Sequence, residues 1–291
     1  MSTSTMSTST VPARAGTVRT ARGTAPRLTF ARVARAEWIK TGTLRSSYWT
    51  VGSTLAFTLL FAAGVLLVIP LAPTAEVPDP AAVIIDNYGA APALGVIGFA
   101  GMFAYALVAI YGVLIVSSER SSSGLIATTL AAVPRRTPVL LAKLLVSSVV
   151  GAVIGLVAGA ASFLLVQPTL AGFGLGSNLF DLDTLQALAG GSVFLGLIAA
   201  MSTAIGSLFR STAAAMGAVL GLLVLAPTIL PIIPGIGGIV SEFLPSTAGM
   251  MLFQSAAQVG WQPIVTGGAV LLAWTAGAAV VGGVLFTRRD V

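Results

Sequence analysis

The segment SSERSSSGLIATTLAAVPRRTPVLLAK, residues 117–143, gathers charged and hydroxyl side chains between two long apolar runs. Glu119 could pair with a basic group of a partner protein or cap the start of a helix, because carboxylates are favoured at helix N-termini. Arg135 and Arg136 could bind acidic side chains of a partner or the phosphates of lipids. The simpler alternative is that both arginines only set the orientation of the chain in a membrane.

The sequence contains few side chains that could carry out catalysis. The chain contains no Cys and no His, which removes thiol chemistry, disulfides, the usual zinc sites and the commonest proton shuttle. Lys40 and Lys143 stand in WIKT and LAKL, without the glycines that a phosphate-binding loop requires. We therefore expect a non-catalytic chain that holds no cofactor and no metal of its own.

The composition is that of an integral membrane protein. Of 291 residues, 56% are hydrophobic and only 8% are charged, and the mean hydropathy is +0.98. About a quarter of the residues of a soluble domain are charged, and a chain of this length could not bury so many apolar helix faces. The net charge of +6 comes from basic residues that flank apolar runs, which indicates membrane topology rather than binding of nucleic acid.

Six apolar windows are long enough to cross a hydrocarbon core about 30 Å thick. They cover approximately residues 48–70, 93–117, 139–166, 186–208, 212–231 and 263–286. With six spans both termini lie on one side of the membrane, and that side receives all 15 basic residues. The opposite loops carry only acidic charges, so the positive-inside rule predicts that both termini are cytoplasmic.

The predicted spans carry no Asp, Glu, Lys or Arg near their middle. Ion-coupled carriers and membrane pumps usually need such residues as relays or ligands. Hydrolases within the membrane need paired carboxylates, an activated Ser or a metal. A secondary transporter and a hydrolase are therefore disfavoured, while a uniporter or an ion site made of backbone carbonyls stays possible.

Two N-terminal segments precede the first span. Residues 1–29 lack apolar periodicity and are predicted to form a disordered cytoplasmic tail, with a targeting peptide as the alternative. Residues 30–45, FARVARAEWIKTGTLR, are predicted to form an amphipathic helix in the membrane interface, with Phe30, Val33 and Trp38 on one face. The alternative for this helix is a basic anchor with no further role.

The segment at residues 117–143 is predicted to contain one short helix. Its serines can cap a helix and Pro134 prevents simple continuation, so the helix would run from about Ser123 to Val133. At 1.5 Å per residue its length is about 15 Å, which is too short to cross the membrane. Leu130 belongs to an apolar strip on this helix, which would contact the membrane surface or a groove in a partner.

Small and aromatic residues inside the spans suggest packing faces. Gly151, Gly155 and Gly159 recur at every fourth position and give the third predicted span a flat groove. Packing within one chain and dimerisation through this face both fit the pattern. Tyr105, Tyr111 and Trp274 could line a substrate path, although aromatic residues in membrane cores more often only pack.

The segment at residues 231–261 is apolar but interrupted by prolines and glycines. It would form short helices that dip into the outer leaflet, because backbone that does not span is tolerated where protein covers its polar groups. An ordinary folded loop fits the same residues.

Three stretches of the chain resemble the integral membrane subunits of ABC-2-type transporters, which are bacterial ABC permeases with six spans. The interfacial helix of that family resembles RVARAEWIKTGTLRSSYW, which includes Glu37, Trp38, Lys40 and Arg45. Residues 117–143 are similar to the family's connection between spans two and three, and TRRDV ends the chain as many members end. The resemblance covers residues 30–291, approximately the whole predicted transmembrane domain.

The resemblance implies an all-α polytopic membrane fold with an N-terminal interfacial helix and a short cytoplasmic coupling helix between spans two and three. The coupling helix would dock on a separate ATPase subunit, which binds ATP and Mg. The residues that fall on this coupling element are Glu119, Gly124, Leu130, Pro134, Arg135, Arg136 and Lys143. Where the family often has a basic or aromatic residue this chain has SSS, so the polar part of the docking contact would differ here.

We therefore expect the permease subunit of an ATP-driven exporter in the bacterial cell membrane. It would form a homo- or heterodimer and pair with two ATPase subunits. Export is favoured because nothing in the chain resembles a dock for a binding protein and because the family mostly exports. The alternatives are a membrane scaffold or immunity-type protein that acts by binding alone, and a facilitated channel. Drugs, peptides, lipids and polysaccharides all fit as cargo.

Overall fold

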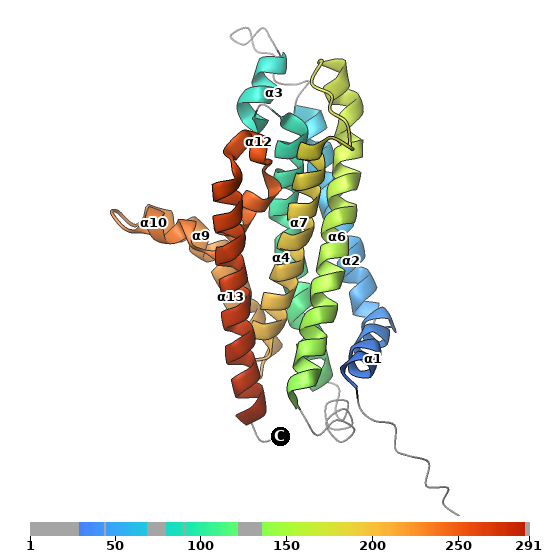
Figure 1. Ribbon diagram of the computed structural model, residues 1–291, viewed down its shortest axis with the longest axis vertical. Helices are drawn as coiled ribbons and strands as arrows, with labels where there is room; N and C mark the ends of the chain where they lie inside the picture. Colours follow the sequence, from blue (N-terminus) through green and yellow to red (C-terminus); the bar gives the residue numbers. More distant parts are fainter. Residues whose placement is uncertain (1–28, 44, 69–79, 90, 122–135, 289–291) are drawn as a thin grey trace, which may run out of the picture.

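The protein is a bundle of long helices (Figure 1). The computed structural model describes residues 29–43, 45–68, 80–89, 91–121 and 136–288. All regular structure in this part of the chain is helical, and six helices are long and apolar enough to cross a membrane. The chain is therefore a multi-pass membrane protein, and the predicted number of spans is confirmed.

The six spans follow one another in the order predicted. They lie in α2 (Arg45–Val68), α4 (Pro92–Ser121), α6 (Arg136–Gly172), α7 (Leu182–Gly206), the segment from α8 (Thr212–Leu220) to Ile232, and α13 (Trp261–Arg288). Two shorter helices, α1 (Phe30–Thr43) and α3 (Pro80–Tyr88), precede α2 and α4. The predicted tail and the predicted short helix at residues 123–133 lie outside the described residues.

The third span is longer than predicted. The prediction ended it near Val166, but α6 passes through Pro168 and continues to Gly172. Proline removes one backbone hydrogen bond and introduces a kink, but it does not have to end a helix whose other turns are well packed. With 37 residues, α6 is about 55 Å long and extends well beyond a hydrocarbon core of about 30 Å.

The fifth span is interrupted by a change of helix type. After α8 the chain forms a π-helical turn (Gly221–Leu225), the single turn α9 (Ala226–Ile229) and a 3-10 turn (Leu230–Ile232). Pro227 would clash with the carbonyl four residues earlier in a regular α-helix, and the wider π turn just before it accommodates that ring. The fifth span is therefore long enough to cross a membrane, but its second half is not a regular α-helix.

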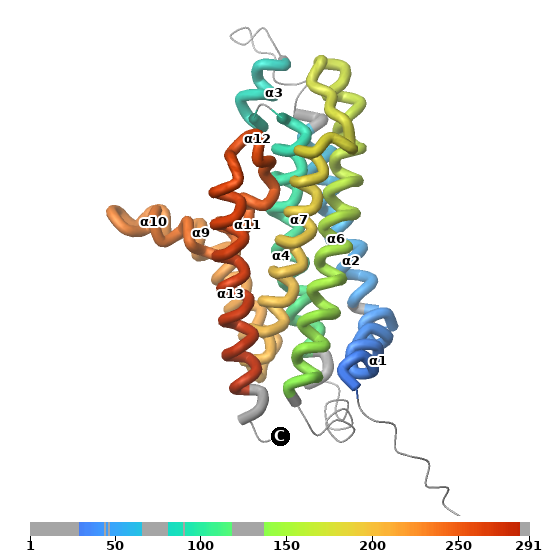
Figure 2. The backbone as a smooth tube through the Cα atoms, viewed as in Figure 1, coloured from blue at the N-terminus to red at the C-terminus, as the bar shows by residue number. Residues whose placement is uncertain are grey.

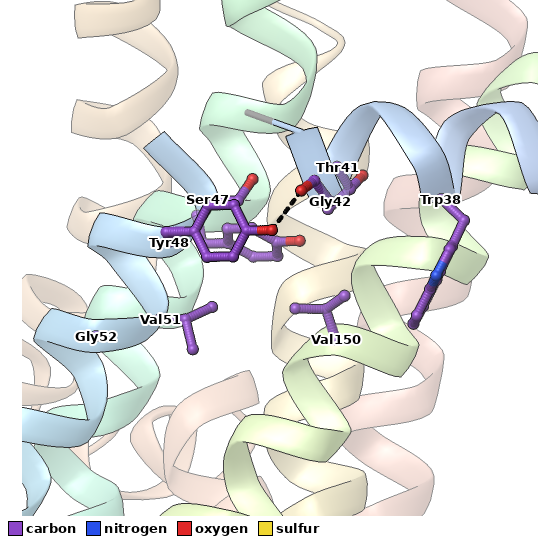
Figure 3. Close-up of a pocket in the computed structure, with 9 residues that line it drawn as sticks. Trp38, Thr41, Gly42, Ser47, Tyr48, Val51, Gly52 and Val150 are labelled. Atoms are coloured by element: carbon purple, nitrogen blue, oxygen red, sulfur yellow. Dashed lines mark hydrogen bonds between the residues drawn. The ribbon is translucent and has the colours of Figure 1, made fainter. Parts of the chain in front are cut away.

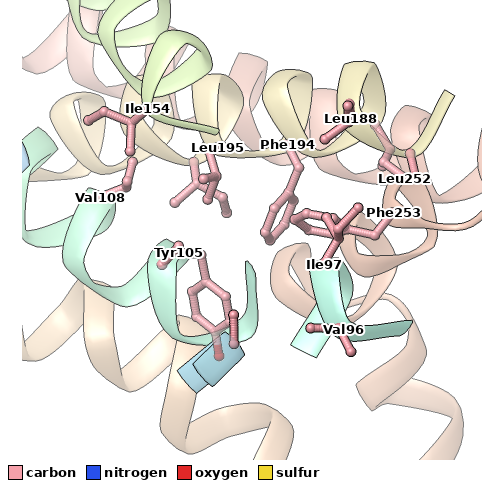
Figure 4. Close-up of a cluster of buried hydrophobic side chains, with 14 of the residues drawn as sticks. Val96, Ile97, Tyr105, Val108, Ile154, Leu188, Phe194, Leu195, Leu252 and Phe253 are labelled. Atoms are coloured by element: carbon pink, nitrogen blue, oxygen red, sulfur yellow. The ribbon is translucent and has the colours of Figure 1, made fainter. Parts of the chain in front are cut away.

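Helix α7 is the centre of the bundle. It packs against α4, α6 and α13, and 67% of its apolar window is buried. Figure 4 shows part of the core around it, where Tyr105 of α4 and Phe253 approach Phe194 of α7. The Phe194 ring meets both neighbours edge to face, at centroid distances of 6.0 Å to Tyr105 and 5.4 Å to Phe253. Side chains thus fill the middle of the bundle.

The segment between the last two spans consists of short helices. It contains α10 (Gly237–Glu242), α11 (Pro245–Met250), a 3-10 turn (Met251–Phe253) and α12 (Ala256–Val259). Helices α9 and α10 project away from the bundle (Figure 1), whereas α11 folds back beside α13 (Figure 2). The fold-back brings the side chain of Phe253 into the core.

The chain enters and leaves the bundle at the same end. Helix α1, the start of α6 and the last turn of α13 lie at one end, and α3 and α12 lie at the other (Figure 1). Lys143 and Arg210 belong to the α1 end, because α6 begins there and α7 returns to it. Asp86 and Asp181 belong to the opposite end, in α3 and just before α7. The basic residues of the described chain thus gather at the α1 end, whereas acidic residues occur at both ends, with Glu37 in α1.

Candidate functional site

Helix α1 contacts the base of α6 through residues spaced four apart. Val33, Glu37 and Thr41 are the buried residues of α1. Residues at this spacing share one helix face. Val33 packs against Val139 and Ala142 of α6 in a small apolar cluster. The helix therefore lies against the bundle along a stripe whose centre is a carboxylate.

That carboxylate is held by two lysines. Lys143 Nζ of α6 donates to Glu37 Oε2 at 2.7 Å, and Lys40 Nζ of α1 donates to Glu37 Oε1 at 2.9 Å. The side chains of Glu37 and Lys143 are each only 5% exposed. A buried charge is tolerated when it is paired and hydrogen-bonded, and each carboxylate oxygen here accepts from an ammonium group. The cluster of Glu37, Lys40 and Lys143 is called the α1–α6 joint below.

The structure separates the residues of the predicted interfacial helix. Glu37 faces α6, whereas Trp38 and Arg45 are exposed, and Lys40 is partly exposed. The predicted apolar face also divides, because Phe30 and Trp38 are exposed while Val33 is buried against α6. An exposed Trp beside basic residues is typical of a membrane–water interface.

The predicted coupling residues are only partly described. Glu119 lies in the last turn of α4, and Arg136 is the first residue of α6. Gly124, Leu130, Pro134 and Arg135 lie outside the described residues. Lys143 is about two turns into α6, where it forms the α1–α6 joint.

The three glycines of α6 face α7 of the same chain. A Cβ atom at Gly151 would lie 2.6 Å from the carbonyl oxygen of Leu195, and one at Gly155 would lie 3.0 Å from that of Gly191. A Cβ at Gly159 would lie 2.9 Å from the side chain of Leu188. The groove that these glycines form is thus occupied by α7, at a backbone separation that larger residues would not allow.

A cleft of 390 Å³ opens where α1 meets α2, next to the α1–α6 joint. Its lining includes Trp38 and Gly42 of α1, Tyr48 of α2, Tyr111 of α4 and Val150 of α6. Figure 3 shows Trp38 and Tyr48 on opposite flanks of the cleft, with the Tyr48 hydroxyl donating to the carbonyl of Gly42 at 2.6 Å. The wall is mostly apolar, so this site can accommodate hydrocarbon.

The aromatic residues considered for a substrate path take different positions. Tyr105 lies in the core, with its hydroxyl 3.3 Å from the carbonyl oxygen of Leu223. Trp274 donates through Nε1 to the carbonyl of Phe243 at 2.9 Å, which ties α13 to the segment after α10. Tyr111 lines the cleft. The three side chains therefore do not line one continuous path.

Reasoning from the sequence missed the pairing within the α1–α6 joint and the cleft. Glu37 is the only acidic residue before Glu76, in a segment that is otherwise basic, and this isolation was the available signal for a special partner. The cleft left no comparable signal, because its lining comes from four helices. Among the described residues, no group of three or more acidic, His or Cys side chains could hold a metal ion.

The α1–α6 joint can transmit movement between two helices but offers no group poised for bond making or breaking. Its carboxylate and ammonium groups satisfy one another. In comparisons with protein families and with curated proteins, the chain matches no family model and no curated protein.

Proposed function

We propose that this chain is the permease subunit of an ATP-driven ABC transporter of the ABC-2 type, acting as an exporter. It resides in a bacterial cell membrane with both termini in the cytoplasm. It forms the substrate pathway as a homo- or heterodimer and pairs with separate ATPase subunits, which bind ATP and Mg. The resemblance in the interfacial helix and in residues 117–143 supports this assignment, as does the lack of a phosphate-binding loop in the sequence.

The observation that carries the proposal is the α1–α6 joint. Helix α6 begins at Arg136, within the segment at residues 117–143 that the resemblance assigns to docking on the ATPase. Lys143, about two turns later, is bound to Glu37 of α1. A displacement of the docking segment would therefore move the base of α6 and α1 together. Coupling of ATP hydrolysis to the spans requires such a rigid transmission.

The packing of the spans supports a pathway between two permease chains. Tyr105, Phe194 and Leu195 fill the middle of the bundle, so passage through one chain alone would require the core to open. By contrast, only 17% of the apolar window of the fifth span and 11% of that of α13 are buried. These two spans present apolar surface to lipid or to a second permease chain.

The proposal is tested by co-expressing the chain with candidate ATPases and purifying the complex from membranes. A permease subunit is expected to retain an ATPase and to support ATP-dependent flux in reconstituted vesicles. A scaffold or immunity-type protein would show no ATP-dependent flux, and a channel would show flux without ATP. Failure of every candidate ATPase to associate would overturn the proposal.

Two substitutions locate the docking contact. Glu119→Lys and Leu130→Asp are expected to weaken ATPase association and flux, because they reverse the charge and interrupt the apolar strip of the predicted coupling helix. Asp86→Lys is the matched control, since Asp86 is an exposed carboxylate at the opposite end of the bundle. Unchanged association and flux in both test variants would contradict the assigned docking segment.

A further inference from the structure

We propose that the cleft between α1, α2 and α6 binds one anionic phospholipid of the surrounding bilayer. The cleft measures 390 Å³ and its wall is mostly apolar, with Gly52 and Val150 among its lining. It lies at the α1 end of the bundle, where α2 begins. A lipid bound here would be a structural ligand, independent of any ATPase and of the transported cargo.

The rise along α2 from Arg45, just outside the lining of the cleft, to Gly52 within it matches the upper part of a phospholipid. Along α2 the chain rises about 10 Å from Arg45 to the lining residue Gly52. This distance takes a lipid from its headgroup through the glycerol esters to the start of its acyl chains. Figure 3 shows Val150 between the flanking rings and Val51 beside the ring of Tyr48, so the start of an acyl chain would lie against two branched aliphatic side chains.

A buried hydroxyl group in the wall of the cleft lacks a partner. Tyr111 lines the cleft and is 2% exposed, and its hydroxyl forms no hydrogen bond within the described part of the chain. A buried donor without an acceptor is unfavourable, and most such groups in proteins are satisfied. The ester carbonyl of a lipid would supply the acceptor once the lipid has displaced the side chains that now shield this hydroxyl.

The charges around the cleft favour an anionic headgroup. Arg45 stands in the chain between the cleft residues Gly42 and Ser47, is exposed, and pairs with no described acidic side chain. The exposed rings of Trp38 and Tyr48 mark the level of the membrane interface, where anionic lipids attract basic side chains. An uncharged apolar ligand would not interact with the charge of Arg45, and a small soluble anion would not contact the apolar wall.

The test uses nanodiscs that contain the full chain and a phosphatidylglycerol probe with a photoactivatable group near the ester end of one acyl chain. A phosphatidylcholine probe with the same acyl chain serves for comparison. In the wild-type chain, we expect crosslinks located by mass spectrometry to concentrate in residues 38–52. We also expect the phosphatidylglycerol probe to give several-fold more of them than the phosphatidylcholine probe.

Two variants separate the apolar part of the site from the charged part. Gly52→Leu fills the cleft, and a Cβ at Gly52 meets no atom within 4 Å, so the fold should tolerate it. Gly64→Leu, on the same helix and equally unobstructed, is the matched control. Gly52→Leu should reduce crosslinking in residues 38–52 several-fold relative to Gly64→Leu, and Arg45→Gln should abolish the preference for phosphatidylglycerol.

Three results would overturn the inference. The first is wild-type crosslinking as strong on the exposed face of α13 as in residues 38–52, which would indicate only the general lipid annulus. The second is equal crosslinking in Gly52→Leu and Gly64→Leu. The third is equal yield from the two probes in the wild-type chain. None of these results depends on whether an ATPase binds, so the proposed function is tested separately.

Discussion

The Nζ atom of Lys143 lies 2.7 Å from Oε2 of Glu37, across 106 positions of sequence. Both side chains are almost completely buried, and Lys40 occupies the other carboxylate oxygen. A buried ion pair adds little net stability, because removing two charges from water costs about as much as their attraction returns. Its energetic importance appears when one partner is removed and the other charge stays buried.

Replacing one member of the α1–α6 joint should therefore be costly. Lys143→Met is expected to lower the free energy of unfolding by about 3–5 kcal/mol, since it leaves the Glu37 carboxylate inside without its main partner. The double variant Glu37→Leu with Lys143→Met should recover most of this loss. Thermal or denaturant unfolding in a mild detergent measures both effects.

The control for this substitution is Lys40→Met, which removes the more exposed lysine of the same cluster. Solvent screens the pair of Lys40 and Glu37, so we expect the free energy of unfolding to fall by less than about 1 kcal/mol. If Lys143→Met were no more destabilising than Lys40→Met, the buried pair would not have the role assigned to it.

The same double variant tests transmission of movement. With the ion pair replaced by apolar contact, the chain should fold and still bind the ATPase of the proposed complex, but α1 would no longer be held by a directional bond. We expect ATP-dependent flux to fall while ATP hydrolysis by the assembled complex continues. Flux and hydrolysis that change in parallel, or not at all, would argue against the joint as a transmission element.

The sequence predicts the membrane fold well because hydrophobic length is a local property. Six windows such as residues 93–117 can be recognised without knowing their neighbours, and the corresponding helix covers Pro92–Ser117 within α4. The break in the fifth span and the extension of α6 through Pro168 were missed, because both depend on how the backbone accommodates a proline.

The candidate site was less predictable because it depends on contacts between helices far apart in the sequence. Glu37 and Lys143 were both singled out, but nothing local indicates that one binds the other. The buried stripe of α1 contains Glu37 and Thr41 among its three residues, so apolar periodicity alone does not identify the stripe that packs against α6. Tertiary contact, rather than amphipathicity, determines the orientation of this helix.

The close approach of α6 and α7 predicts a sharp contrast between two glycines. At Gly151, a Cβ would lie 2.6 Å from the Leu195 carbonyl oxygen and 2.8 Å from the Ala199 Cβ, so Gly151→Ala forces the helices apart. We expect a destabilisation of about 1–3 kcal/mol. Gly217→Ala meets no atom within 4 Å and should be neutral or stabilising by up to about 1 kcal/mol through helix propensity. Unfolding of both variants under one condition provides the measurement, and equal effects would contradict the close packing.

The fold-back of the segment after α10 predicts a large effect at Phe253. Its side chain is 4% exposed and its ring meets Phe194 edge to face. Phe253→Ala should therefore lower the free energy of unfolding by about 3–5 kcal/mol. Phe243, in the same segment, is 56% exposed, and its backbone carbonyl accepts a hydrogen bond from Trp274. Phe243→Ala is therefore the matched control, with an expected change of about 0.5 kcal/mol or less. Limited proteolysis would show whether the segment detaches in the Phe253 variant, and an intact segment in both variants would contradict its anchoring role.

The concentration of Lys and Arg at the α1 end of the bundle predicts the orientation in the membrane. The sequence has no Cys, so single cysteines can be introduced without a background of native thiols. Phe180→Cys lies in the exposed connection before α7, and Ser211→Cys lies in the connection after α7. The 25 residues of α7 separate the two positions. Those residues rise about 37 Å, enough to cross the hydrocarbon core. Because Arg210 is at the basic end, a membrane-impermeant maleimide should label Phe180→Cys in intact cells and Ser211→Cys only after permeabilisation. Labelling with the opposite pattern would reverse the orientation, and labelling of both sites from outside would contradict the crossing by α7.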